Sequence, residues 1–399
     1  MTHIAELTDY LAAAGLLSPI EASTQSIVDV AGTLARWLGG ESDSDVPELS
    51  RRVSAARGIV FIVADGLGVE QLDRTVPDGF LRGAMGGELR SVFPSTTATA
   101  LTSLASATWA GVHGVTGWWT HLPALSRTLC ALTYSERGTG VRADHLGVGM
   151  SDIVATRSLY RTERADILSL LPQHLAESPY ARWTRSSTRI LSYRTPGHAM
   201  RKAARLARRQ EGRFLLSVYL PHVDAAIHRW GTEHAETTAV IGELDRGASR
   251  LADTLPPDVT FCLTADHGLI DLDRKLHTVL EDGDPVLETL QVPPTGEGTA
   301  PFFHVREGQE QRLRNALDRS AAGSAFRLVP VDHMAHAGFF GPDGIDPRVR
   351  GRFGTHIGIA REPALLEYIA AGHRSIRHRG IHGGLRPGEM RVPLSVAGR

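Results

Sequence analysis

Arg57-Gly-Ile-Val-Phe-Ile-Val-Ala-Asp65-Gly66-Leu-Gly68 is a run of apolar, mostly β-branched and aromatic residues that ends abruptly in an Asp-Gly pair. Such a run predicts a strand that is buried on both faces of a parallel sheet. In an open α/β sheet, ligands bind at the carboxyl ends of the strands, so Asp65 would lie where chemistry takes place. An Asp-Gly pair is also typical of a plain turn or a helix cap, and Asp65 taken alone fits that interpretation better. Three later stretches of the sequence make a functional role for Asp65 the better interpretation.

Length and composition limit the kind of protein that can contain this strand. The 399 residues are enough for one large α/β domain with an insertion, or for two domains of ordinary size. Hydrophobic residues make up 42% of the chain, which predicts a sizeable core and argues against wholesale disorder. The formal net charge of −1 gives no sign of nucleic acid or of an anionic membrane as a partner. Cys130 and Cys262 are too few for a disulfide framework.

The N-terminal residues contain no basic segment followed by an apolar run, so no signal peptide is expected. No window of the sequence is long and apolar enough to span a bilayer. We therefore expect a soluble, cytoplasmic protein that has no membrane partner. The sequence leaves a homodimer open.

Outside the first strand, the chain alternates between strand-like and helix-like segments, which predicts an α/β fold with a mostly parallel central sheet. The expected helices are two within residues 4–39 and single ones near 98–107, 167–175, 199–212 and 309–319. The expected strands are 57–64, 89–93, 181–187, 214–220, 259–264, 301–305 and 326–331. The predicted domains are an N-terminal helical segment (1–50), a main domain (51–272 and 349–399) and an inserted α+β subdomain that could act as a lid (273–348).

Three later stretches, two of them directly after predicted strands, carry side chains that could bind a metal. Asp224 and His228 are four residues apart, which places them on one face of a helical turn. Asp266 and His267 precede a glycine at the end of a strand, where the turn lets both converge on one ion. His382 precedes two glycines near the C-terminus. Each stretch alone is more typical of a surface pair, a turn or a structural histidine.

Taken with Asp65, these stretches predict a site for two divalent metal ions. Mixed nitrogen and oxygen ligation favours Zn²⁺, with Mn²⁺ as an alternative. Two such ions stabilise both the attacking and the leaving oxygen in a phosphoryl displacement. The candidate nucleophiles lie in Phe93-Pro-Ser95-Thr96-Thr97, where a loop enters a helix whose N-terminus favours an anion. One of these hydroxyls is also the expected N-cap of that helix.

The motif set resembles the alkaline phosphatase superfamily, and within it the type I phosphodiesterase/nucleotide pyrophosphatase branch. The resemblance runs from about residue 57 to residue 392 and implies an alkaline phosphatase-like α/β/α sandwich. The ligands that it implies for one zinc, together with the nucleophile, are Asp65, Asp266 and His267. Those that it implies for the other zinc are Asp224, His228 and His382. The family's nucleophile stands ten residues before the glycine of a T-G-x-x-P-x-x-H-G stretch, and alignment of that Thr-Gly with Ala105-Ser106 gives Thr96, with Thr97 as the fallback.

One departure from the family pattern concerns phosphate recognition. Nucleotide pyrophosphatases of this branch have an Asn shortly after His-Gly, but Val115–Thr120 contains none. Trp118 and Thr120 are therefore candidate substrate contacts, and so are Arg189 and Arg194, which could reach the distal phosphate of a nucleotide. The basic stretch around 182–209 is more typical of a solvated helix face, and nucleic-acid binding is the least favoured interpretation because aromatic residues are sparse there.

These residues predict a metal-dependent hydrolase in which Thr96 attacks phosphorus and water then releases the phosphoryl group. The expected substrate is a phosphodiester or pyrophosphate of a nucleotide. The alternatives are a phosphomonoesterase or phosphonate hydrolase with the same metals, and a transferase that passes the phosphoryl group to an alcohol. A binding protein with a degenerate site is disfavoured, because all six ligands and a hydroxyl are present.

Overall fold

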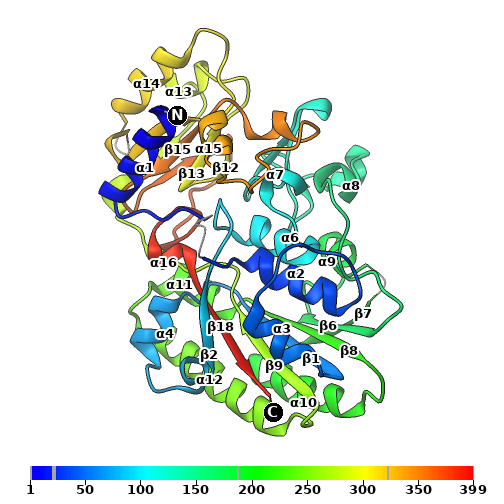
Figure 1. The fold of residues 1–399 in the computed structure, drawn as a ribbon. Helices are drawn as coiled ribbons and strands as arrows, with labels where there is room; N and C mark the ends of the chain where they lie inside the picture. Colours follow the sequence, from blue (N-terminus) through cyan, green and yellow to red (C-terminus); the bar gives the residue numbers. More distant parts are fainter. Residues whose placement is uncertain (1, 20–23, 187, 321–322, 399) are drawn as a thin grey trace.

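The computed structural model describes residues 2–19, 24–186, 188–320 and 323–398 (Figure 1). Residues 20–23 of the predicted N-terminal helices lie outside the described residues. So do Ser187, the last residue of a predicted strand, and residues 321–322 of the predicted insertion. Among the described residues, no helix combines the length and apolar composition needed to cross a bilayer.

A twisted seven-stranded sheet forms the centre of the described chain, in the order β2-β18-β9-β1-β8-β6-β7. Every neighbouring pair is parallel except those made by β18, which runs antiparallel to β9 and β2. The strands are β1 (Gly58–Ala64), β2 (Met85–Arg90), β6 (Asp166–Pro172), β7 (Arg189–Tyr193), β8 (Phe214–Leu220), β9 (Val259–Thr264) and β18 (Arg391–Ala397). The predicted α/β fold with a mostly parallel sheet is confirmed.

The register of the three innermost strands brings their carboxyl ends level. Ala64, at the end of β1, pairs with Leu220, the last residue of β8. Val63 pairs with Thr264, the last residue of β9. Side chains that follow these strands directly therefore meet at one edge of the sheet, as the quoted stretch predicts.

Helices cover both faces of this sheet, as Figure 1 shows. One packed group consists of α4 (Val69–Thr75), α5 (Phe80–Gly83), α10 (Pro196–Arg209), α11 (His222–Trp230) and α12 (Ala235–Thr254). The other consists of α2 (Ile27–Trp37), α3 (Pro47–Val53), α6 (Thr97–Ser106) and α9 (Pro179–Arg185). The core between the layers is built from apolar residues of the strands, which are buried along their whole length in β1, β8 and β9.

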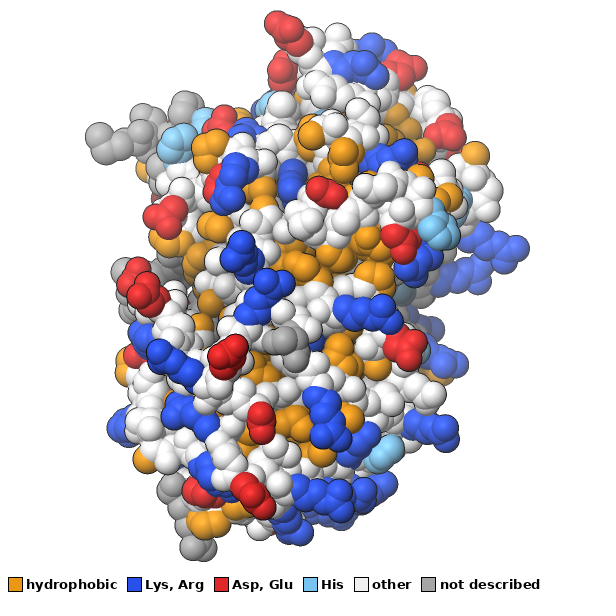
Figure 2. All heavy atoms as spheres, turned by 90° about the vertical axis from the view of Figure 1, so that its right-hand side faces the viewer, with side chains coloured by type: hydrophobic (Ala, Val, Ile, Leu, Met, Phe, Trp, Pro, Cys, Tyr) orange, Lys and Arg blue, Asp and Glu red, His pale blue; other side chains and the backbone are white. Residues whose placement is uncertain are grey.

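The basic segment forms α10, which turns its small apolar residues inward. Ala199, Ala203 and Ala207 are buried, whereas Arg201 and Arg205 are exposed. Lys and Arg side chains gather along the lower edge of the face drawn in Figure 2. The arrangement is that of a solvated helix face, as the sequence predicts.

A second, smaller sheet lies beyond the carboxyl edge of the central one. Its order is β12-β13-β15-β14, and its strands are β12 (Thr295–Glu297), β13 (Ala300–Phe303), β14 (Phe326–Pro330) and β15 (His356–Ala360). The helices beside it are α1 (Thr2–Ala13), α13 (Pro285–Glu288), α14 (Glu310–Asp318) and α15 (Val331–His336). The predicted three-part division of the chain stays a prediction, but β15 shows that this sheet takes in residues beyond 348.

The remaining described elements connect the two sheets. Three antiparallel strands form a small sheet: β3 (Thr120–Leu122), β4 (Arg127–Cys130) and β5 (Ser135–Glu136). Two strand pairs are β10 (Ile270–Asp271) with β17 (Gly380–Ile381), and β11 (His277–Leu280) with β16 (Leu365–Tyr368). The short helices are α7 (Ala110–His113), α8 (Met150–Ile153) and α16 (Pro387–Met390).

Two local predictions are wrong. The segment near 167–175, expected as a helix, forms β6, and its leucines are buried between neighbouring strands. The segment 181–187, expected as a strand, belongs to α9, which begins at Pro179 with Ser178 capping its first turn. A short apolar run fits either a helix or a strand. The segment at 181–187 is helical because Ser178 caps the first turn of α9, and the segment near 167–175 is a strand because it pairs with β7 and β8.

Candidate functional site

Loops at the carboxyl ends of β1, β8 and β9 carry the acidic residues of the site. Asp65 follows β1 directly, and its carbonyl oxygen accepts a hydrogen bond from the Asp224 N–H at 3.0 Å. Asp224 lies in the first turn of α11, after β8. Asp266 and His267 follow β9, and His382 follows β17. The backbone bond between the first two loops fixes their side chains against each other.

One cluster of ligand atoms is fully buried. His267 Nε2 lies 3.5 Å from Asp65 Oδ1 and 3.5 Å from Asp266 Oδ2. The Gly66 and His267 N–H groups donate to Asp266 Oδ1 and fix that carboxylate. The Tyr219 hydroxyl donates to Asp65 Oδ2. The two remaining carboxylate oxygens and the imidazole nitrogen therefore face one another.

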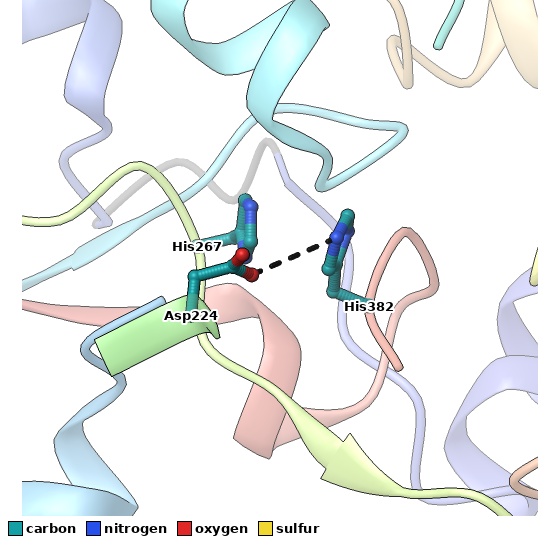
Figure 3. A group of neighbouring side chains, drawn as sticks. All are labelled: Asp224, His267 and His382. Atoms are coloured by element: carbon teal, nitrogen blue, oxygen red, sulfur yellow. Dashed lines mark ion pairs between the residues drawn. The ribbon is translucent and has the colours of Figure 1, made fainter. Parts of the chain in front are cut away.

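A second cluster shares His267 with the first. Asp224, His267 and His382 point toward a common space from three separate segments, as Figure 3 shows. Asp224 Oδ1 lies 3.9 Å from His382 Nε2 and 3.2 Å from His228 Nε2. The His228 Nδ1 lies 2.8 Å from the Gly380 carbonyl oxygen, which accepts its proton and leaves Nε2 free to face the cluster.

These residues fit a pair of divalent cations. Asp65 Oδ1 and Asp266 Oδ2 are buried and have no hydrogen-bond donor, and buried Asp224 Oδ1 has only the His228 imidazole, at 3.2 Å, beside it. Burial and the negative charges of Asp266 and Asp224 raise the pKa of Asp65 well above its ordinary value. For Asp224 burial also acts to raise the pKa, but the hydrogen bond and charge of His228 outweigh it and lower the pKa. Buried carboxylates without donors are costly unless a cation neutralises them.

Burial lowers the pKa of His382 well below its ordinary value, and the neighbouring His267 adds to the shift. A neutral imidazole is the form that binds a metal. The six ligands predicted from the sequence therefore come together in two adjoining groups.

A cavity of about 590 Å³ opens beside the second cluster. Its lining includes Thr97, Asp224, His228 and His382. Residues 294–298 and 365–370 also line it. The cavity thus lies between the carboxyl edge of the large sheet and the smaller sheet, which is a common position for a ligand site.

Comparison with known proteins bears on what this site does. A family model of type I phosphodiesterase/nucleotide pyrophosphatase matches residues 59–322, which is more than half of the chain. The chain belongs to this family. It is therefore a hydrolase of phosphoester bonds, from a family whose members use divalent metal ions. A search of curated protein sequences gives no match.

Two kinds of solved structure share the fold. Murine ectonucleotide pyrophosphatase/phosphodiesterase 5 aligns with a TM-score of 0.62 at 14% identity, over 86% of this chain and 88% of its own. An inactive variant of that protein is in complex with AMP. Phosphonoacetate hydrolase from Sinorhizobium meliloti 1021, in complex with phosphonoformate, aligns with a TM-score of 0.57 at 15% identity, over 86% and 90% of the two chains. The alkaline phosphatase-type fold predicted from the motifs is confirmed.

The phosphodiesterase-type nucleophile predicted at Thr96 does not lie against the metal-ligating residues. Thr96 is fully buried, forms the N-cap of α6, and donates its hydroxyl to Glu297 Oε2 at 2.8 Å. Thr97 Oγ1 instead lies 3.1 Å from His267 Nε2. Thr97 also lines the cavity. The structure therefore favours Thr97, the fallback assignment, as the hydroxyl of the site.

The reason for the one-residue slip lies at the other end of α6. Ala107 caps this helix with φ of +54°, the left-handed conformation that favours glycine. The Thr-Gly of the family stretch therefore corresponds to Ser106-Ala107, not to Ala105-Ser106. Counting ten residues back from Ala107 gives Thr97.

Of the four predicted substrate contacts, only Trp118 lines the cavity. It is 37% exposed. Thr120 is fully buried and accepts a hydrogen bond from the Thr116 N–H, so it does not face the cavity. Arg189 and Arg194 lie at the two ends of the edge strand β7, and neither lines the cavity; Arg194 donates to Gln173. The sequence predicts a strand at 181–187 and none at 189–193, where β7 lies.

Three residues of the cavity were missed by sequence reasoning. Glu297 on β12 is the partner of Thr96, and burial raises its pKa. His378 lies against His228 with ring centroids 4.0 Å apart. Arg137 follows β5 and lines the cavity. None of them belongs to a recognisable motif, although His378 stands four residues before His382, which was a usable signal.

Proposed function

We propose that this enzyme cleaves a phosphodiester or nucleotide pyrophosphate through a phosphothreonine formed on Thr97. The observation that carries the proposal is the 3.1 Å contact between the Thr97 hydroxyl and His267 Nε2, at the end of the cavity where the metal-ligating groups converge. Thr97 is also the first residue of α6, and the N-terminus of a helix stabilises phosphate charge. Family membership supports the reaction class.

Zinc is the proposed metal, with manganese as the alternative, because the donor set combines carboxylate oxygens with imidazole nitrogens. When bound, two such cations would offset the charge of the buried carboxylates and lower the pKa of a coordinated hydroxyl. The residues proposed to hold them are Asp65, Asp266 and His267 for one, and Asp224, His228 and His382 for the other.

The chain's own residues are proposed to carry the two chemical steps. In the first, a bond forms between Thr97 Oγ1 and phosphorus as the bond to the leaving oxygen breaks, and the proton of the Thr97 hydroxyl passes through solvent to the leaving group. In the second, water attacks phosphorus, the Thr97 Oγ1–P bond breaks, and a proton of that water restores the Thr97 hydroxyl. Tyr219, which donates to Asp65, holds that carboxylate in place throughout.

The test compares hydrolysis of bis-p-nitrophenyl phosphate and p-nitrophenyl phosphate by zinc-loaded enzyme, with Thr97→Ala and Thr96→Ala as a matched pair. We expect a preference for the diester, and a loss of about a thousandfold in kcat for Thr97→Ala but of less than about tenfold for Thr96→Ala. Acid quenching of the wild-type reaction with the diester should trap a p-nitrophenyl phosphoryl group on the peptide that contains Thr97.

Three outcomes would contradict the proposal. A preference for the monoester would indicate a phosphomonoesterase. Greater damage from Thr96→Ala would return the nucleophile to Thr96. Turnover that depends on an added alcohol would indicate a transferase.

A further inference from the structure

Arg137 lines the same cavity as Thr97 and residues of the second metal-ligand cluster. Its guanidinium carbon lies 5.2 Å from the ring centroid of Tyr368 and 5.9 Å from that of Trp119. Nη1 and Nη2 donate to the carbonyl oxygens of Pro294 and Pro293 at 2.5 and 3.0 Å. The guanidinium is thus held in one position by two aromatic rings and two carbonyls, all of them uncharged.

The charge of Arg137 has no counter-charge in the part of the chain that the structure describes. No carboxylate forms an ion pair with it there. The acidic groups nearest in sequence or across the cavity are already engaged: Glu136 pairs with Arg127 at 2.6 Å, and Glu367 contacts His277 at 3.2 Å. Burial lowers the pKa of Arg137 to about 10, which leaves it protonated at neutral pH.

Donor groups of Arg137 also remain unused. A guanidinium has five N–H groups, and two of them reach the proline carbonyls. Partly buried N–H donors on a fixed cation, in a cavity, match the oxygens of a phosphate or carboxylate in charge and in planar geometry. A cation that is desolvated without an anion costs free energy, and a bound anion would recover it.

The position of Arg137 relative to the reacting end follows from the β12 strand. The backbones of Trp119 and Gly296 are hydrogen-bonded in both directions, at 3.1 and 2.7 Å. Glu297, the next residue, reaches Thr96 at the start of α6. The short strand β12 therefore links the segment that holds the guanidinium to the residues around the proposed nucleophile, and Arg137 and Thr97 line one cavity.

We propose that Arg137 is the residue of this chain that binds a second anionic group of the substrate, beyond the phosphoryl group that reacts. This rests on the proposed function, because it assumes that the phosphoryl group that reacts lies at Thr97. Arg137 then favours substrates whose leaving group carries a phosphate over diesters with two neutral arms. The segment 115–120 lacks the phosphate-binding asparagine of the family pattern, and Arg137 supplies a contact to substrate phosphate from another part of the chain.

Two substrates that share the nucleoside and the reacting phosphorus, but differ in the leaving group, separate the contribution of Arg137 to binding of the leaving group from its contribution to the rest of the reaction. ATP has pyrophosphate as the leaving group, whereas the p-nitrophenyl ester of AMP has a leaving group without phosphate. We expect Arg137→Met to lower kcat/KM for ATP about thirtyfold or more and to change that for the nitrophenyl ester less than about threefold. Arg137→Lys should fall between wild type and Arg137→Met, because it keeps the charge but loses the planar fork.

Inorganic pyrophosphate gives a second readout. As an inhibitor of nitrophenyl ester hydrolysis, it should bind wild type more tightly than Arg137→Met by about the same factor. The matched control is Arg142→Met, which removes an exposed arginine paired with Asp144 outside the cavity. The control should leave both substrates and the inhibition unchanged.

The inference is overturned if Arg137→Met lowers activity on both substrates equally, with a reduced Tm, since that would make Arg137 only a structural link to the Pro293–Pro294 segment. It is also overturned if wild type shows neither a preference for ATP nor inhibition by pyrophosphate. Failure of the proposed function is distinct: the nitrophenyl ester would then not be hydrolysed by wild type at all. Calorimetric titration with pyrophosphate would still compare wild type with Arg137→Met in that case.

Discussion

At the scale of single residues, neighbouring threonines have different tasks because a helix begins between them. Thr96 is the N-cap, with extended backbone, and its hydroxyl points to Glu297 in the smaller sheet. Thr97 is the first helical residue, and its hydroxyl points to His267. A shift of one residue in the alignment therefore decides whether the chosen hydroxyl is that of Thr96, which links the two sheets, or that of Thr97, which faces the metal-ligating site. Sequence motifs fix such a register only if the far end of the helix is also placed correctly.

Ala107, which fixes that far end, gives a test that is independent of activity. A non-glycine residue in the left-handed conformation is strained by about 1 kcal/mol, and glycine removes the strain. We expect Ala107→Gly to raise the free energy of unfolding by up to about 1 kcal/mol in urea denaturation. The control Ala105→Gly, inside the same helix, should lower it by about 1 kcal/mol or more. A loss of stability in Ala107→Gly would contradict the proposed register.

At the scale of elements, the strands that carry the metal ligands could be predicted because their sequences are continuous apolar runs ended by Asp. β1 and β9 are of this kind, and so is β8 with its Asp four residues on. β6 and α9 could not, because a short leucine-rich run and a short basic segment fit either type of element. β6 is a strand because it pairs with β7 on one side and β8 on the other, and α9 is a helix whose first turn is capped by Ser178. Only the assembled fold determines these partners.

The contact between α6 and α7 depends on the proton of one buried histidine. The Val115 N–H donates to His113 Nδ1 at 3.1 Å, so the proton is on Nε2, which faces Ser103 Oγ at 3.0 Å. Burial lowers the pKa of His113 from 6.5 to about 3, and the positive charge of Arg352 adds to the shift. A second proton would have to displace the Val115 donor.

This contact predicts an acid-dependent loss of stability. In the unfolded chain His113 binds a proton near pH 6.5, but in the folded protein only near pH 3, so the unfolded state binds more protons between these values. The contribution of His113 is therefore complete above pH 6.5 and falls by up to about 1.4 kcal/mol per pH unit as the pH decreases toward 3. His113→Asn keeps an acceptor without titrating, so its unfolding free energy should fall less steeply between pH 7.5 and pH 5 in urea titrations. Parallel curves for the two proteins would contradict this account.

At the scale of the whole molecule, the metal-ligating residues and the cavity have different origins in the sequence. Five of the six predicted ligands follow strands β1, β8 and β9 of the large sheet, and their motifs were enough to place them together; His382 follows β17, outside that sheet. The cavity wall comes from the smaller sheet and the β3-β4-β5 sheet, whose segments meet only in the folded chain. Glu297 and Arg137 therefore could not be found from the spacing of residues in the sequence. Arg189, predicted as a substrate contact, lies on β7 and does not line the cavity.

We expect the stability of the fold to depend on bound metal, because several loops meet around buried carboxylates. Asp65 Oδ1 and Asp266 Oδ2 are buried without hydrogen-bond donors, and a divalent cation that binds only the folded state would remove the cost of bringing these charges together. We expect EDTA dialysis to lower Tm and zinc to restore it, with saturation at two equivalents per chain and a stabilisation of about 4 kcal/mol at a thousand times Kd. Asp266→Asn should reduce the zinc-dependent shift, because it keeps the oxygen that accepts from Gly66 and His267 but removes the charge. Asp271→Asn, at a nearby carboxylate that accepts from Thr232 outside the cluster, should leave the shift intact. A Tm that does not change with EDTA or zinc in the wild-type protein would show that these carboxylates are stabilised without metal, and would remove the basis for a two-metal site.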